Sequence, residues 1–260
     1  MLQKSILKTY SSLQNKKYRQ MHGLFIVEGN KMVEELLFSD FKIHHILYLP
    51  GQSIPSTGKA QKEIQTTEIT SREMGRISSL KSPPPMLGIV KIPVVKNNDG
   101  ILKDGITLFL EDIGDPGNLG TIIRVADWFG IQNVIASPRT VDVYNPKVIQ
   151  SCMGSIFRIQ LLYKESEDFI KRYKKRTGNR VYGAVMQGAN LYKENLSDNT
   201  LIILGNESRG ISARIDHLID KKITIPPGEN GTGSESLNVA VAAGIICNEF
   251  SRASFLRQNS

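Results

Sequence analysis

Short apolar runs alternate with longer amphipathic stretches along the whole chain. Runs of four to eight largely apolar residues predict buried strands, whereas apolar residues spaced three or four apart predict helices. The first part should contain a helix at 3–20, a strand at 24–28, a helix at 30–38, a strand at 43–49, a short helix, a strand at 66–69, a helix at 70–79 and a strand after the three prolines at 83–85. Asn, Asp and Gly residues at 96–100 then indicate a linker.

From residue 106 onward, strands and helices continue to alternate. The predicted order is strand 106–112, helix 118–130, strand 132–137, helix 145–153, strand 157–162, helix 165–176, strand 181–186, strand 201–204, helix 211–219, strand 222–225 and helix 236–252. Apolar strands that alternate with helices imply a mainly parallel sheet covered on both faces. We therefore expect an α/β fold in two domains, residues 1–98 and 104–252.

The formal net charge of +8 lies almost entirely in the first domain. Residues 1–98 contain 14 lysines and arginines against 7 acidic residues, whereas residues 99–260 contain 19 against 18. This excess favours contact with a polyanion through the first domain, although a merely basic surface would have the same composition. A second cluster, KRYKKRTGNR at 171–180, is more typical of a solvated helix face than of a binding site.

Several classes of protein are not supported by the sequence. The basic N-terminus lacks the apolar core of a signal peptide, and no apolar stretch approaches the roughly 18 residues of a membrane span. We therefore expect a cytoplasmic protein without a membrane segment. The chain also lacks GxGxxG after a strand, the P-loop pattern and GxSxG, which argues against a dinucleotide-binding fold, a P-loop NTPase and a serine hydrolase.

Cysteines and histidines form no metal-ligand pattern. Cys152 and Cys247 are far apart, and each lies in an apolar helical context where a thiol behaves as a small hydrophobic residue. None of the four histidines shows HxxxH spacing. His44 and His45 share a predicted strand, so one ring should face inward and the other outward. We expect neither a disulfide nor a metal ion.

The first of three notable loops follows the strand at 106–112. Its turn DPGN leads into a helix that Asn118 is suited to cap. The apolar residues of this helix share one face, and Thr121, Arg124 and Trp128 fall on the opposite face. An ordinary amphipathic helix with a surface arginine would show the same spacing.

Two further loops also follow strands, where open α/β sheets bind ligands. In LIILGNESRGIS, the strand runs directly into Gly205 and Glu207, and Gly210 is expected to open the next helix. Glycine at a strand exit lets backbone groups approach a ligand closely. In the third loop, a strand ends at Ile225–Pro226, and Ser236-Leu237-Asn238 should cap a helix of small and apolar residues. A buried C-terminal helix with an ordinary cap would have the same sequence features.

Together, NLGTIIRVADWFG, LGNESRGIS and IPPGENGTGSESLNVAVAAG resemble the three motifs of SpoU (TrmH-like) ribose methyltransferases of the SPOUT superfamily, in order and at similar separations. The resemblance covers about 104–252. Residues 1–98, through KKYR and GLFIVEG, resemble the L30e-like substrate-binding domain that precedes many such catalytic domains. One departure is the loop GENGTGSE at 228–235, which is a few residues longer than is usual in the family.

The resemblance implies a C-terminal trefoil knot, S-adenosylmethionine as cofactor, and a homodimer with the active site at the subunit interface. It also implies roles for individual residues. The residues matching catalytic positions are Asn118, Arg124, Glu207, Ser236 and Asn238. The residues matching cofactor-binding positions are Leu204, Gly205, Ile225, Pro226, Ser236 and Leu237. The family assigns Arg124 the role of base, but a guanidinium seldom deprotonates, which favours a role in stabilising the developing alkoxide.

The sequence therefore predicts an RNA 2′-O-ribose methyltransferase whose basic first domain binds the RNA. This two-domain layout resembles members that act on ribosomal RNA, so large-subunit rRNA is favoured over transfer RNA, while the nucleotide stays open. Two alternatives remain: a non-catalytic RNA-binding or ribosome assembly factor on the same fold, and an enzyme that methylates a base.

Overall fold

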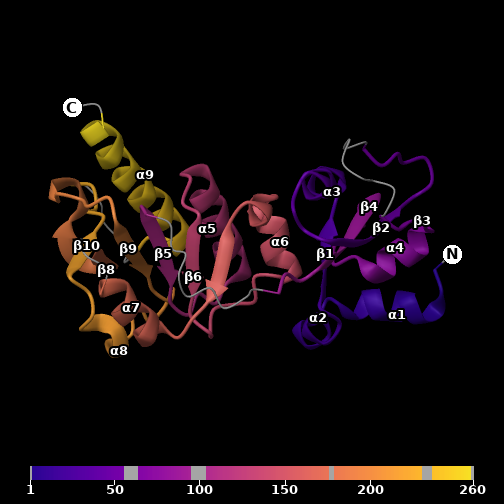
Figure 1. The fold of residues 1–260 in the computed structure, drawn as a ribbon, viewed down its shortest axis with the longest axis horizontal. Coiled ribbons are helices and arrows are strands. Elements are labelled where there is room, and N and C mark those ends of the chain that lie inside the picture. The colour runs from indigo at the N-terminus through magenta and orange to yellow at the C-terminus, as the bar shows by residue number, and fades with distance from the viewer. Residues whose placement is uncertain (1, 56–63, 95–103, 176–178, 230–235, 259–260) are drawn as a thin grey trace. The chain divides into compact units, whose positions relative to one another are not determined.

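The computed structural model describes residues 2–55, 64–94, 104–175, 179–229 and 236–258 (Figure 1). Contacts divide the chain into two compact units. Unit 1 comprises Met1–Asp99 and Asp142–Arg158, and unit 2 comprises Gly100–Val141 and Ile159–Ser260. The predicted linker at 96–100 lies outside the described residues. The hydrophobic pattern gives no indication that residues 142–158 pack with the first unit.

Unit 1 is built on a mixed four-stranded sheet of order β1-β4-β2-β3. The strands are β1 (Leu24–Glu28), β4 (Met86–Lys91), β2 (Ile43–Tyr48) and β3 (Thr66–Glu68). β4 is antiparallel to both of its neighbours, whereas β2 and β3 are parallel. All four strands lie close to their predicted positions. β1, β2 and β4 are largely apolar runs bounded by turn residues, whereas β3 is a short polar edge strand.

The helices of unit 1 differ from the prediction at the N-terminus. The single helix expected at 3–20 is two helices, α1 (Lys4–Ser12) and α2 (Lys16–His22). The Asn15 side chain accepts a hydrogen bond from the Lys17 N–H at 2.9 Å and so caps a new helix, which accounts for the break. The other helices are α3 (Asn30–Leu37), α4 (Ser71–Ile77) and α6 (Pro146–Cys152). The short helix predicted before β3 lies outside the described residues.

His45 faces inward, as predicted, but His44 does not face outward: its half-buried ring also contacts Tyr10, because the strand pairing shifts register between Ile43 and His45. The His45 ring is buried and hydrogen-bonded at both nitrogens, to the Tyr10 hydroxyl at 3.0 Å and to the Thr67 hydroxyl at 2.8 Å. Burial, and secondly the charge of neighbouring His44, lower the pKa of His45 to about 4. His45 is therefore a neutral core residue.

A buried ion pair holds α2 to the segment 142–158. Arg19 is only 2% exposed, and its Nε and Nη2 donate to Asp142 Oδ2 at 3.0 and 2.6 Å. Its Nη1 donates to the carbonyl oxygens of Leu13 and Gln14 at 2.9 and 2.8 Å. A guanidinium removed from water needs partners of this kind, since an unpaired buried charge is strongly destabilising.

Unit 2 contains a six-stranded sheet of order β10-β8-β9-β5-β6-β7 in which every neighbouring pair is parallel. The strands are β5 (Ile106–Leu110), β6 (Asn133–Ala136), β7 (Gln160–Tyr163), β8 (Arg180–Asn190), β9 (Thr200–Leu204) and β10 (Lys221–Thr224). The predicted α/β class with a mainly parallel sheet is confirmed.

Three elements of this half of the chain have other bounds than predicted. The strand expected from 157 begins at 160, because Met153 and Gly154 adopt left-handed backbone conformations and a 3-10 helix follows at Ser155–Phe157. β8 continues to Asn190, because a register shift in its pairing with β10 lets it extend past 186. The helix expected at 211–219 is only α8 (Ala213–Asp216).

Helices pack on the sheet of unit 2 in two groups. α7 (Ser166–Lys174) and α8 share a buried apolar cluster with β5, β6, β8 and β9. α5 (Pro116–Trp128) and α9 (Val239–Gln258) pack against each other, as Figure 1 shows.

By length and composition alone, Val239–Arg257 would also allow a membrane span, contrary to the sequence expectation. A helix that packs in a protein core passes the same test, and Ala243, Ile246 and Phe250 are buried.

Replacement of Asp142 by alanine should strongly destabilise unit 1. The change leaves the buried Arg19 guanidinium without its carboxylate, which should lower the free energy of unfolding by about 3–5 kcal/mol. Hydrogen exchange of the β1–β4 amides measures this loss. Arg158→Ala is the matched control, since it removes the more exposed pair with Glu35 and should cost no more than about 1 kcal/mol. Equal losses in both variants would contradict an anchoring role for Asp142.

Candidate active site

The first two motif loops emerge at the same edge of the unit 2 sheet. β5 and β9 are neighbouring parallel strands, and their last residues, Leu110 and Leu204, are paired. The segments that follow them therefore leave the sheet side by side. The third motif loop leads into α9, which packs on α5 of the first motif.

A chain of side-chain amides and one carboxylate connects all three loops. The Asn238 Nδ2 donates to Asn118 Oδ1 at 2.9 Å, and the Asn118 Nδ2 donates to Glu207 Oε1 at 3.0 Å. Each of these residues comes from a different motif. The structure thus brings together three of the five predicted catalytic residues.

Asn118 can take part because it does not cap its helix. The predicted cap role is wrong: Asp115 precedes α5, and its side chain accepts a hydrogen bond from the Asn118 N–H at 2.8 Å. The Asn118 side-chain amide is thereby left to bridge Glu207 and Asn238. Asn238 itself is a helix cap, as predicted, since its Oδ1 accepts from the N–H groups of Ala240 and Val241 at 2.9 and 3.3 Å.

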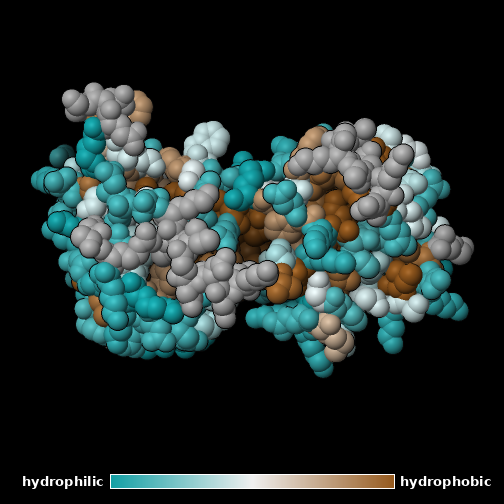
Figure 2. Space-filling view, viewed as in Figure 1, coloured by the Kyte–Doolittle hydropathy of each residue, from teal (hydrophilic) through white to brown (hydrophobic). Residues whose placement is uncertain are grey.

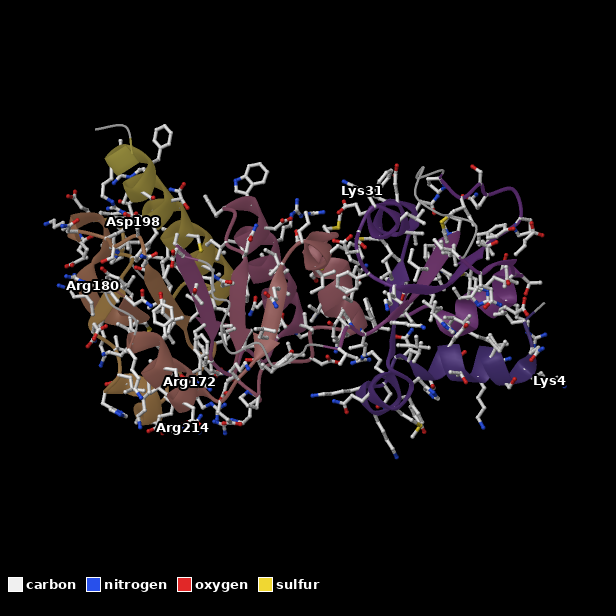
Figure 3. The ribbon with its side chains drawn as sticks, viewed as in Figure 1. Lys4, Lys31, Arg172, Arg180, Asp198 and Arg214 are labelled. Carbon is white, nitrogen blue, oxygen red and sulfur yellow. The ribbon has the colours of Figure 1, made fainter. Side chains whose placement is uncertain are left out.

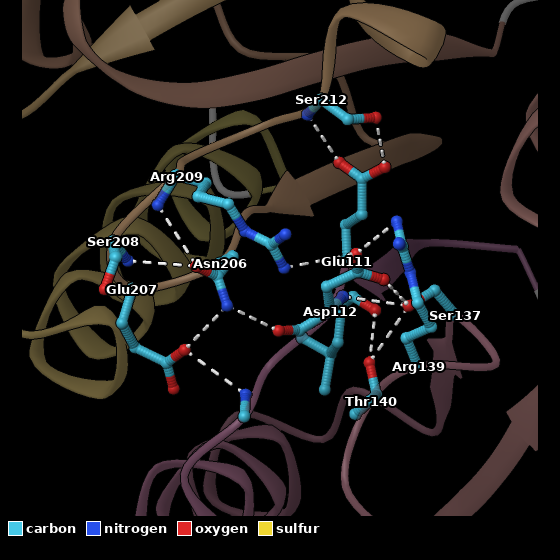
Figure 4. Close-up of polar contacts among 12 residues, drawn as sticks. Glu111, Asp112, Ser137, Arg139, Thr140, Asn206, Glu207, Ser208, Arg209 and Ser212 are labelled. Carbon is cyan, nitrogen blue, oxygen red and sulfur yellow. Dashed lines mark hydrogen bonds and ion pairs between the residues drawn. The ribbon is translucent and has the colours of Figure 1, made fainter.

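Glu207 is the acceptor at the centre of this arrangement. It also accepts from the Asn206 Nδ2 at 3.3 Å, as Figure 4 shows. Besides Asn118, the backbone N–H groups of Gly114 and Asp115 donate to its carboxylate, each at 3.2 Å. Partial burial works to raise the pKa of Glu207, but these hydrogen bonds outweigh burial, and the net pKa lies below the ordinary value of 4.5. The interactions are therefore present above that value and are lost only as the pH falls through the lower pKa of the folded state. At neutral pH Glu207 is a charged acceptor that holds the first two loops together.

Gly205 is required by the tight turn that carries Glu207. Asn206 and Gly210 exchange two backbone hydrogen bonds, so the loop doubles back on the end of β9. A Cβ at Gly205 would lie 2.3 Å from the carbonyl carbon of Gly210, which no side chain could tolerate. Gly210, with φ +65°, closes this turn and does not open the next helix, which begins at Ala213.

Arg124 is not part of the chain of amides among the described residues. On α5 the predicted division of faces is confirmed: Thr121 and Arg124 are exposed, and Trp128 is 84% exposed. The residues of the opposite face are fully buried, namely Leu119, Ile122, Ile123 and Ala126. Ser236 is exposed two residues before Asn238.

The predicted cofactor positions lie at the ends of β9 and β10 and just before α9. Leu204 is buried, and Gly205, Ile225 and Pro226 are half-buried. Leu237 is an exposed apolar side chain on the approach to α9. Backbone groups beside apolar side chains suit a nucleoside with a polar sugar and a flat base. Most of the lengthened loop, residues 230–235, lies outside the described residues.

Sequence reasoning missed a second layer of polar residues behind Glu207. The Glu111 carboxylate accepts from the N–H and hydroxyl of Ser212 at 2.9 and 2.7 Å, which fixes the far end of the second loop. Asp112 has a left-handed backbone (φ +56°), and its carbonyl oxygen accepts from the Asn206 Nδ2 at 2.8 Å. Two carboxylates directly after an apolar strand could have identified this layer, but a positive φ at aspartate leaves no sequence pattern.

The Asp112 carboxylate also binds polar and charged side chains from the neighbouring loops (Figure 4). It accepts from the Ser137 hydroxyl at 2.7 Å and pairs with Arg139 Nη2 at 2.8 Å. Arg209 of the second loop lies farther off, at 3.9 Å. The loops after β5, β6 and β9 are therefore joined through one side chain.

Replacement of Glu207 by alanine should loosen the first loop. Loss of the acceptor should raise the exchange rates of the Gly114 and Asp115 amides about threefold to tenfold, as expected for one ordinary hydrogen bond each. Because the pKa of Glu207 is lowered, the difference from the unsubstituted chain should be constant between about pH 5 and pH 8. Hydrogen exchange resolved by NMR measures both effects. Glu165→Ala, at an exposed site on unit 2, is the control. Unchanged exchange of the Gly114 and Asp115 amides in Glu207→Ala would show that Glu207 does not hold the first loop.

Comparison with known proteins places these motifs in a family. Residues 105–248 match the SpoU rRNA methylase family, and residues 4–88 match the MRM3-like substrate-binding domain. A Bacillus subtilis protein named 23S rRNA (guanosine(2553)-2′-O)-methyltransferase RlmP is 30% identical over 92% of this chain and 93% of its own length. A 23S rRNA (uridine(2479)-2′-O)-methyltransferase from Streptomyces viridochromogenes is 25% identical over 88% of this chain and 84% of its own.

Solved structures agree over nearly the whole chain. A TrmH-family protein from Porphyromonas gingivalis has a TM-score of 0.84 at 34% identity and covers 97% of this chain and 99% of its own. An AdoMet-bound rRNA methyltransferase from Sinorhizobium meliloti has a TM-score of 0.81 at 26% identity, with 97% and 96% coverage. The resemblance inferred from the three motifs is confirmed, and this chain belongs to the SpoU rRNA methylase family.

Proposed function

We propose that this chain transfers a methyl group from S-adenosylmethionine to a ribose 2′-hydroxyl of large-subunit ribosomal RNA. The observation that carries the proposal is the polar chain through Asn118, Glu207 and Asn238, which unites the three family motifs at one edge of the sheet. The names of the Bacillus and Streptomyces relatives support the ribose over the base and ribosomal RNA over transfer RNA.

The residues present suit S-adenosylmethionine as cofactor. Leu204–Gly205, Ile225–Pro226 and Leu237, together with Ser236, would hold it through backbone groups and apolar contacts. The AdoMet-bound Sinorhizobium structure, which has the same fold, supports this assignment. When bound, the cofactor would supply an electrophilic methyl group, so the chain has to place the hydroxyl and stabilise its oxygen while the proton passes to solvent water.

Arg124 is the residue that we assign to the reacting hydroxyl. Its side chain is exposed on α5, and it has no ion-pair or hydrogen-bond partner within the described ranges. Guanidinium groups stay protonated in proteins, so Arg124 stabilises the developing alkoxide and does not act as a base. The Glu207 carboxylate already accepts hydrogen bonds from Gly114, Asp115 and Asn118, so we assign it the role of positioning Asn118. Ser236 and Asn238 complete the polar side of the site.

The active form is a homodimer whose C-terminal part is knotted. Support for the dimer comes from exposed apolar side chains on the two helices that pack together: Trp128 of α5, and Val241 and Phe255 of α9. The knot is what membership of the family implies, and the strand order, in which the later β9 lies between β8 and β5, is compatible with it. The first domain, residues 1–98, binds the RNA through its basic surface.

Arg124→Ala should abolish turnover while retaining the cofactor. Loss of one charge-stabilising donor should lower methyl transfer about 100-fold to 1,000-fold. The measurement is incorporation of labelled methyl into ribosomal RNA from a strain lacking this gene, with cofactor binding followed by calorimetry. Arg172→Ala, an exposed arginine on α7, is the matched control. Equal loss of binding and turnover would refute the assignment, and no transfer by the unsubstituted chain would favour a non-catalytic RNA-binding factor.

Charged substitutions on the α5–α9 surface should separate the subunits. Trp128→Glu combined with Val241→Glu places two carboxylates on exposed apolar positions, so the monomer should fold while the dimer is disfavoured. Sedimentation velocity measures the change. Phe38→Glu on unit 1, also an exposed apolar site, should leave the dimer intact. A double variant that sediments as a dimer would show that this surface is not the interface.

A further inference from the structure

Helix α2 presents almost its entire surface to solvent. Of its seven residues only Arg19 is buried, and that side chain is held by Asp142 and by the carbonyl oxygens of Leu13 and Gln14. The other six residues are exposed. Figure 1 shows α2 end-on beside α1, and Figure 3 shows its side chains pointing away from the sheet of unit 1. A buried ion pair, and not an apolar stripe, therefore holds α2, and within the described residues nothing covers its outer face.

This outer face carries uncompensated positive charge. The chain contains no acidic residue before Glu28. Four lysines are exposed on α1 and α2, and none of them has an ion-pair partner in the part of unit 1 that the structure describes. They are Lys4, Lys8, Lys16 and Lys17. Figure 2 shows the surface over α2 as mainly hydrophilic. The partner of such a face is an anion.

Flat rings lie among these charges. Tyr18 and His22 are one helical turn apart, with ring centroids 6.5 Å apart and an interplanar angle of 17°. The Lys17 Nζ lies 6.0 Å from the Tyr18 ring centroid. Tyr18 is 38% exposed, and neighbouring Met21 is 62% exposed. Nearly parallel rings at the surface, beside lysines, provide both a stacking face and a charge.

We propose that α2 is a stacking platform for an unpaired RNA base, with Tyr18 and His22 against the base and Lys16 and Lys17 at the flanking phosphates. Proteins hold unpaired nucleotides by combining these two interactions. An acidic protein or membrane would use the lysines but gain nothing from parallel rings. The inference rests on the proposed function, because it names how the same RNA substrate is held.

Binding of the full chain to two fluorescently labelled RNAs, measured by fluorescence anisotropy, tests the platform. The RNAs are a 12-nucleotide single strand of mixed sequence and a blunt 12-base-pair duplex. Tyr18→Ala should weaken single-strand binding at least about fivefold, since one stacked base contributes about 1–3 kcal/mol, and should leave the duplex within about twofold. Tyr18→Trp should restore binding. Gln20→Ala, exposed on the same helix, is the matched control, and thermal unfolding confirms that each variant is folded.

The charges have a separate signature. Lys16→Ser with Lys17→Ser should reduce the slope of log affinity against log salt by about 1.4 for the single strand, because each phosphate contact contributes about 0.7. Unchanged single-strand binding by Tyr18→Ala would overturn the platform. Equal weakening of single strand and duplex would overturn it as well. If the protein bound phosphatidylglycerol vesicles but no single-stranded RNA, the proposal would be overturned, and the ligand of α2 would be an anionic membrane surface.

Methyl transfer to ribosomal RNA, measured on the same variants, separates this inference from the proposed function. If the single strand binds in a Tyr18-dependent way but the unsubstituted chain transfers no methyl, the platform stands and the proposed function fails. If methyl transfer proceeds and Tyr18→Ala leaves the KM for RNA unchanged, the proposed function stands and the platform fails.

Discussion

A carboxylate surrounded by hydrogen-bond donors stays charged and fixes every group that donates to it, and Glu207 is such a carboxylate. It receives two backbone N–H groups from the loop after β5 and the amide of Asn118 at the start of α5. Asn118 in turn receives the amide of Asn238 at the start of α9. Glu207 therefore connects all three motif loops, and Glu111 and Asp112 behind it give the first two loops further support. The cofactor position Gly205, the approach to α9 at Leu237 and the exposed Arg124 lie on segments that this interaction connects.

Much of the fold could be predicted because its causes are local. Apolar runs and their turn residues indicate most strands of both sheets, the mostly polar edge strands β3 and β10 excepted. Helix periodicity places Arg124 on the exposed face of α5. The predicted bounds of an element were wrong where a single side chain sets them, as at Asn15, which caps a second helix. The packing of residues 142–158 with unit 1 rests on contacts between residues far apart in sequence, such as the Asp142–Arg19 ion pair and the ring contact of Tyr144 with Phe25. No local pattern could reveal it.

The sequence predicted which residues belong to the candidate site, but not how they contact one another. The resemblance named Asn118, Glu207 and Asn238, but spacing gave Asn118 the wrong local role, since Asp115 is the cap. The residues behind them, Glu111 and Asp112, act through a buried hydrogen bond and a left-handed backbone, which depend on the folded loops. In both units one charged residue orders a surface: Glu207 the motif loops, and Arg19 the helix α2.

The central claim is that these three loops form a site for methylation of a ribose hydroxyl. Mass spectrometry of nuclease-digested ribosomal RNA, after reaction with the protein and S-adenosylmethionine, tests it most directly. The account predicts a single new 2′-O-methylnucleoside, with the methyl group on the sugar fragment. A new methyl group on a base, or no new methylated nucleoside despite measurable cofactor binding, would contradict it.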